Sequence, residues 1–156
     1  MEDPLLFLGK QADTEIIKKL LGDIELDEYV SIKRGETDVY LPNHKKGICL
    51  LFESERYIHS KYGKTLPSEA PLLTAIFMYG RNHEEFSEFT GKLLNGLLLS
   101  DSRETVRGKL GDSKKYNPES ESETWNFPSG LKFFVDYDPD RNGILLAQYG
   151  ISANAI

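Results

Sequence analysis

The sequence predicts an α+β fold of tandem helix–β-meander repeats, in which helices pack on one face of an antiparallel sheet. Three observations support this. The segment at residues 14–23 has a loose counterpart at residues 103–112. Each copy is followed by a proline turn and then an apolar run, and each unit closes on a Tyr-Gly pair, at Tyr79 and at Tyr149. Antiparallel strands with a covering helix are typical of a two-layer domain.

Length and composition indicate one globular domain. The chain has 156 residues, of which 39% are hydrophobic and 11% aromatic, and this is enough to bury a core. We expect a single domain made of two structural repeats, residues 5–80 and 97–151, joined by a connector at residues 81–96.

The first repeat is expected to open with a helix. Asp13 is a candidate cap for a helix from about Thr14 to Leu21, which Gly22 would end. Its four apolar side chains fall on one face, as in an amphipathic surface helix. Strands of this repeat are expected at residues 28–33, 37–41, 48–53 and 72–79.

A long insertion, residues 54–71, separates the last two strands of the first repeat. It is rich in Tyr, Lys, Ser, Gly and Pro and has little periodicity. Loops of this length in a compact domain are usually functional or mobile. The connector follows the last strand, and a short helix is expected there around residues 84–89.

The second repeat begins with a helix at residues 103–110, with Ser102 as its cap and Gly111 at its end. Residues 113–122 are polar and contain a proline, and we interpret them as an exposed loop. Strands are expected at residues 123–127, 131–137 and 144–149.

The last two strands are predicted to join in a tight hairpin. Asn142-Gly143 is the preferred pair for a type I′ turn. Three alternating aspartates precede it and resemble a calcium loop. The EF-hand pattern requires glycine at the sixth place and glutamate at the twelfth, where this chain has Arg141 and Ala147. We therefore interpret the segment as a hairpin end and predict no metal site there.

The sequence contains no pattern that indicates catalysis. The single cysteine, Cys49, lies in an apolar run, which favours a buried side chain over a reactive thiol. The three histidines are scattered and lack the spacing of metal ligands. We predict that the protein is not an enzyme, with no catalytic residues, no cofactor and no metal.

Charge and hydropathy narrow the range of partners. The net charge is −6, from 25 acidic and 19 basic residues, which argues against nucleic acid and suits a basic protein partner. The apolar runs are far shorter than the roughly 20 residues of a membrane helix. The start of the chain has acids where a signal peptide carries basic residues. We expect a cytoplasmic, soluble protein.

Two aromatic residues are candidates for partner binding. Tyr40 and Trp125 occupy matching places before the proline turn of each repeat. Either they pack a helix against the sheet, or they anchor a partner on its open face. Acids close to them in the sequence are expected at the surface, where they could meet basic groups of the partner. The predicted partner-binding set is Glu28, Asp38, Tyr40, Glu121, Glu123 and Trp125.

The sequence also resembles a known class of proteins. The resemblance rests on residues 96–111, Trp125, Gly130, Leu131 and Tyr137, and upstream on residues 40–42 and 47–48. This pattern is similar to that of bacterial immunity proteins encoded beside polymorphic toxins, including those of contact-dependent inhibition and type VI secretion. The duplication also resembles the tandem repeats of β-lactamase-inhibitor proteins and of the outer-membrane assembly lipoprotein fold, which would present a concave sheet to a protein target. The chain departs from the pattern at Asp112, where a proline usually follows the Leu-Gly that ends the helix.

The resemblance implies a protein that binds a cognate toxin domain and occludes its active site, as a monomer or weak dimer. A nuclease is the preferred toxin class, because nucleases have basic clefts. Two alternatives remain open. One is a small acidic secretion chaperone that holds an effector protein, and the other is a small-molecule-binding protein built around residues 54–71.

Overall fold

The computed structural model describes residues 3–27, 29–81, 83–140 and 142–156. Within them the chain forms a seven-stranded antiparallel sheet with the order β1-β2-β3-β7-β6-β5-β4. The strands are β1 (Asp38–Asn43), β2 (Ile48–Glu53), β3 (Leu72–Tyr79), β4 (Lys115–Asn117), β5 (Ser122–Asn126), β6 (Leu131–Asp138) and β7 (Gly143–Ile151). The α-helices are α1 (Glu15–Asp23), α2 (Glu55–Tyr62) and α3 (Arg103–Leu110), and the 3-10 turns are η1 (Pro4–Leu6), η2 (Leu94–Gly96) and η3 (Ala153–Ala155).

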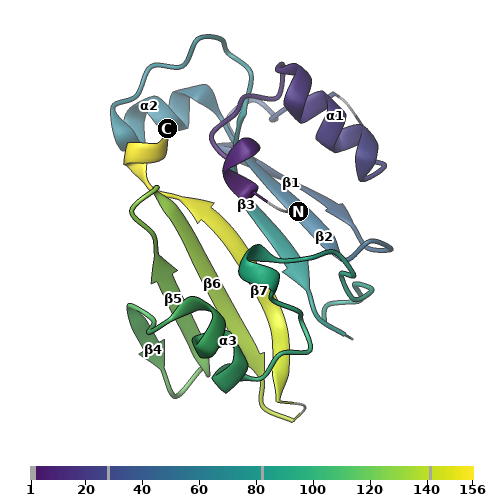
Figure 1. The fold of residues 1–156 in the computed structure, drawn as a ribbon. Helices are drawn as coiled ribbons and strands as arrows, with labels where there is room; N and C mark the ends of the chain where they lie inside the picture. Colours follow the sequence, from purple (N-terminus) through teal and green to yellow (C-terminus); the bar gives the residue numbers. More distant parts are fainter. Residues whose placement is uncertain (1–2, 28, 82, 141) are drawn as a thin grey trace.

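The predicted α+β fold is confirmed. Helices α1 and α3 lie on the same side of the sheet (Figure 1). The core lies between these helices and the sheet, where Leu21 of α1 and Val106 of α3 pack in one cluster with Phe52, Phe133 and Tyr149. This side of the sheet is called the helix face below, and the opposite side the open face.

The sheet is assembled from two meanders that meet at its centre. Strands β1 to β3 pair in sequence order on one side, and strands β4 to β7 on the other. The two meanders are joined by pairing of β3 with β7, where Ala75 lies opposite Gly150. Helix α1 precedes the first meander and α3 the second, which is the order of a tandem helix–β-meander repeat.

Several predicted elements are confirmed with their boundaries. Strands β2 and β3 and helix α3 have the bounds expected from the sequence. Ser102 caps α3 by accepting a hydrogen bond of 3.2 Å from the Thr105 amide. Helix α1 differs at both ends. Thr14 is its cap residue and Asp23 its last residue. The Asp13 carboxylate does not cap the helix and instead accepts a hydrogen bond from the Ser68 hydroxyl.

The insertion at residues 54–71 contains helix α2, which hydrophobic periodicity does not predict. Ser54 caps this helix by accepting a hydrogen bond from the Tyr57 amide, and Gly63 ends it in the left-handed conformation at φ 67°. Ile58 is the one fully buried side chain of the helix. A single buried residue gives almost no periodic signal, so the helix is specified by its two ends.

Three other expectations about secondary structure are wrong. The described part of residues 28–33 forms no strand, although Val30 is buried as a strand residue would be. Residues 84–89 form no helix, because Glu84 and Glu85 have positive φ values of 50° and 65°. The polar segment at residues 113–122 contains the short strand β4, which pairs with β5 at the edge of the sheet.

The β6–β7 hairpin is confirmed, but its turn is not the expected two-residue turn. Gly143 already pairs with Asp138 in the sheet. Asn142 has a positive φ of 54°, whereas Gly143 does not, and a type I′ turn needs both. Asp138 and Gly143 are the ends of the two strands, so the loop comprises residues 139–142 and has four residues where two were predicted.

Candidate functional site

The open face carries the side chains that alternate with those of the core. Successive residues of a strand point to opposite faces, so the neighbours of core residues such as Leu50 and Phe133 face away from the helices. Paired residues form rows across the sheet. One row is Pro42, Cys49, Phe77, Gln148, Phe134 and Thr124, and the next is Tyr40, Leu51, Ala75, Gly150, Lys132 and Asn126.

These rows present apolar side chains that are only partly buried. Leu51, Phe77, Phe134 and Leu146 are half-buried, and Tyr40 is 54% exposed. The ring of Tyr40 lies 6.0 Å from the ring of Phe77. Aromatic and aliphatic groups on a half-open sheet face are typical of a surface that binds another protein.

One end of the open face is covered by the connector. Phe86 stacks on Tyr79 with 3.8 Å between their ring centroids. The ring centroid of His44 lies 4.3 Å from that of Phe86. Beneath them Cys49 is buried, and this burial raises the pKa of its thiol to about 11. A thiol with such a pKa stays protonated near neutral pH and is a poor nucleophile. The expectation that Cys49 is buried is confirmed.

The other end of the open face has a hollow of about 330 Å³. Its floor is the central Ala75–Gly150 pair, which has almost no side-chain volume. Around this floor stand residues of α2, β2, β3, β5, β6 and β7. They are Leu51, Glu53, Tyr62, Thr74, Thr124, Lys132, Phe134, Gln148 and Ile151.

A buried carboxylate lines this hollow. Glu53, at the end of β2, is only 9% exposed. It accepts a hydrogen bond of 2.7 Å from the Thr74 hydroxyl. Among the described residues no cationic side chain forms an ion pair with it. Asp38 of β1 pairs directly with Glu53, so a second, half-exposed carboxylate lies on the same edge of the open face.

The helix face holds the other buried glutamate, in a different environment. Glu123 of β5 is 1% exposed. The Nε atoms of Arg103 and Arg107, both on α3, each lie 3.1 Å from its carboxylate. The Tyr137 hydroxyl donates a third bond, of 3.3 Å. Burial, followed by the Glu123 charge, raises the pKa of Tyr137. The Arg103 guanidinium also stacks on the ring of Tyr116, 3.5 Å from its centroid.

The six residues predicted from the sequence do not form one surface. Trp125 is 3% exposed and lies in the core of the helix face, where its Nε1 donates to the Gly111 carbonyl over 3.2 Å. Packing of a helix against the sheet, one of the two roles considered for Trp125, is therefore its role in the structure. The expectation that Glu123 is a surface acid is wrong, because α3 covers it. Glu28 lies outside the described residues.

The structure places two of the six predicted partner-binding residues side by side on one strand. Tyr40 and Asp38 lie on β1, on the open face, within the same edge of the sheet. Partial burial raises the pKa of Tyr40, and the nearby Asp38 carboxylate raises it further. Glu121 is half-buried on the other half of the sheet, beside a small hollow next to Arg103 and Tyr137.

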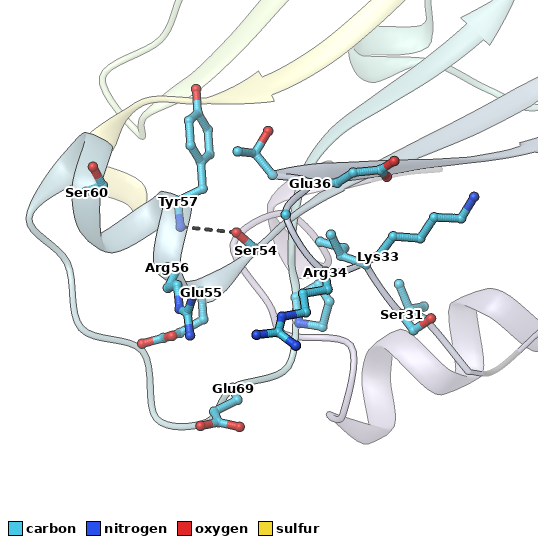
Figure 2. Close-up of a pocket in the computed structure, with 15 residues that line it drawn as sticks. Ser31, Lys33, Arg34, Glu36, Ser54, Glu55, Arg56, Tyr57, Ser60 and Glu69 are labelled. Carbon is cyan, nitrogen blue, oxygen red and sulfur yellow. Dashed lines mark hydrogen bonds between the residues drawn. The ribbon is translucent and has the colours of Figure 1, made fainter.

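A larger hollow lies elsewhere, at the insertion. It has a volume of about 830 Å³ and is formed by residues 30–37, the start of α2 and the loop before β3. In Figure 2 the side chains of Arg34, Arg56, Glu55 and Glu69 lie near one another, while that of Lys33 extends away from them. Most of its lining residues are exposed, and both charge signs are present. This is a wide surface depression without a buried polar group that would fix a ligand.

Two further properties concern ions and membranes. Among residues 3–27, 29–81, 83–140 and 142–156, no group of three or more His, Cys, Asp or Glu side chains is placed to hold a metal ion. Within the same residues, no helix has the length and apolar character needed to cross a bilayer.

Comparison with known proteins gives little further information. No family model matches the chain, and no curated protein matches it significantly. Among solved structures, it is similar to a crystal structure of a cysteine-rich secretory protein from Staphylococcus aureus, with a TM-score of 0.46 and 10% sequence identity. The match covers 94% of this chain and 44% of that one, so the chain spans less than half the length of that structure.

Proposed function

We propose that this protein is a binding module that docks a protein partner on the open face of its sheet. The observation that carries the proposal is the pair of rows around Tyr40, Leu51, Phe77 and Phe134, whose side chains are half-buried or exposed. An apolar centre with a polar rim is the usual composition of a protein interface. Tyr40 is the most exposed aromatic side chain of this surface and is well suited to be an anchor.

Within this class, the proposed role is that of a cytoplasmic immunity protein. It would bind the toxic domain of a cognate bacterial toxin and occlude its active site without chemistry of its own. Two features support this choice. The resemblance to immunity proteins covers both repeats, and the net charge of −6 would attract a basic toxin such as a nuclease.

The test uses crosslinking from two positions in the native host. A photo-crosslinking amino acid replaces Phe134 on the open face in one variant and Lys18 on α1 in the other. We expect the Phe134 variant to capture the C-terminal domain of a large secreted protein, and the Lys18 variant to capture much less. The captured domain should stop growth when it is expressed alone and lose this effect when this protein is expressed with it.

A pair of tyrosine variants then measures the contribution of the open face. Tyr40→Ala should weaken binding of the captured domain roughly tenfold or more, as an anchor residue does. Tyr29→Ala is the matched control, because Tyr29 is 79% exposed and lies outside the sheet. Capture of a partly unfolded effector would favour the chaperone alternative. Equal capture from both faces would overturn the docking model.

A further inference from the structure

We infer that the hollow on the open face receives an arginine side chain of the protein partner, with Glu53 as its counter-ion. This inference rests on the proposed function, because it assigns the chemistry of the same surface. It commits to one occupant, a guanidinium group presented by a folded protein.

Glu53 lacks a cationic partner among the described residues. Burying a carboxylate is costly unless it is paired and hydrogen-bonded. Glu123 meets this requirement with two arginines and a tyrosine hydroxyl. Glu53 is nearly as buried, but within the described part of the chain its side chain has only the Thr74 hydroxyl as a hydrogen-bond partner. A cation supplied from outside would complete the environment of Glu53 in the way that α3 completes that of Glu123.

The charge next to Glu53 also favours a bound cation. Asp38 lies directly opposite Glu53 across the β1–β2 pair, and like charges in this position destabilise a sheet. A bound cation would relieve this repulsion. Lys132 is the cationic side chain that lines the hollow. It lies on β6, three strand spacings from β2 and so roughly 14 Å away, and it would stand at the opposite end of an inserted side chain.

The shape of the hollow favours a single long side chain as its occupant. The floor formed by Ala75 and Gly150 leaves a depression of about 330 Å³, near the lower limit of roughly 300 Å³ for small-molecule sites. This space suits one long side chain better than a whole ligand. The rings of Tyr62 and Phe134 line it. A guanidinium stacks on aromatic rings and binds a carboxylate through two N–H groups, which an ammonium cannot do.

The direct test uses a small arginine probe and does not require the toxin. Nα-acetyl-arginine amide is titrated into the ¹⁵N-labelled protein while amide chemical shifts are followed by NMR. We expect saturable shifts centred on Thr74, Gly150 and Ile151. Nα-acetyl-citrulline amide, which has the same shape without the charge, should give no saturable shifts. Glu53→Gln should weaken binding of the arginine probe roughly tenfold, whereas Glu69→Gln, an exposed acid at the other hollow, should not.

Any of three results would overturn the inference: no saturable shifts up to the solubility limit, equal binding of the citrulline probe, or equal affinity of the Glu53→Gln variant. A second measurement separates this inference from the proposed function. If a toxin domain is captured and Glu53→Gln does not weaken its binding, the inference is wrong and the function stands. If the probe binds as expected and no partner is captured on the open face, the proposed function fails and the arginine site remains.

Discussion

Glu53 and Glu123 are both buried in the same sheet but lie on opposite faces, and among the described residues only Glu123 has cationic partners. The helix face therefore contains a completed charge cluster, in which α3 is tied to β5. The open face contains a carboxylate held by one hydroxyl. This asymmetry distinguishes the stabilising role of one glutamate from the binding role proposed for the other.

The first prediction compares the two glutamates by stability. Glu123→Gln should lower the free energy of unfolding by about 2 kcal/mol, because it removes charged hydrogen bonds to both arginines. The loss is moderated because Arg103 and Arg107 are partly exposed and can turn to solvent. Glu53→Gln should change stability by less than about 1 kcal/mol. Urea unfolding of both variants measures the two changes in the free energy of unfolding. Equal decreases in the two variants would contradict the assigned roles.

The second prediction concerns alkaline pH. Burial raises the pKa of Tyr149 from 10.0 to about 12, and that of Tyr79 also to about 12. The folded protein therefore keeps protons that the unfolded chain releases above about pH 10. The resulting stability is complete below that pH and is lost as the pH rises towards about 12. Between about pH 10 and pH 12, each such tyrosine should lower the free energy of unfolding by about 1.4 kcal/mol per pH unit.

The tyrosine contribution is measured by denaturant unfolding at a series of alkaline pH values. Tyr149→Phe should make the slope shallower, although it also loses the hydrogen bond of 2.8 Å from the Leu94 amide and so lowers stability at neutral pH. Tyr29→Phe, at an exposed position, should leave the slope unchanged. An unchanged slope in the Tyr149→Phe variant would show that this hydroxyl titrates normally.

The third prediction uses the single tryptophan as a probe of the helix face. Because Trp125 is buried beneath α3, its fluorescence should be blue-shifted in the native protein and resist quenching by acrylamide. Binding of a partner to the open face should leave both properties unchanged. A large change in quenching on binding would place the partner on the helix face and refute the proposed surface.

The fourth prediction concerns two glycines with opposite constraints. Gly108 lies inside α3 with open space where a Cβ would stand, so Gly108→Ala should stabilise the protein by about 0.5–1 kcal/mol. Gly47 has a φ of +66°, and its Cβ would collide with the backbone at Ser87. Gly47→Ala should cost about 2 kcal/mol or more. Thermal unfolding of the two variants in parallel should show shifts of opposite sign.

Much of the fold was predictable from the sequence because its signals are local. A nearly continuous apolar run specifies β2 at residues 48–53, and a cap followed by a terminal glycine specifies α3 at residues 103–110. Helix α2 has the same two end signals, Ser54 and Gly63. These signals alone do not predict a helix, because the segment between them has one fully buried side chain and no apolar stripe.

The candidate site was less predictable because its residues meet through strand register. Tyr40 stands two residues before Pro42, whereas Trp125 stands three residues before Pro128. A difference of one residue places a side chain on the other face of a sheet, and the two aromatics accordingly lie on opposite faces. The sequence does contain one indication of Glu53, because it is an acid at the end of an apolar strand. Its pairing with Asp38 and the hollow beside it depend on the assembled sheet, so the sequence does not predict them.

The central pairing of β3 with β7 has a consequence for the folding pathway. Within each meander, pairing joins strands that are neighbours in the chain, and such contacts close short loops at little entropic cost. The Ala75–Gly150 contact instead closes a loop that contains the whole second half. High contact order slows folding, so the slow step should be the docking of two preformed meanders. A polypeptide cut between the halves would keep each meander's local pairings, and its two fragments should reassemble along β3 and β7.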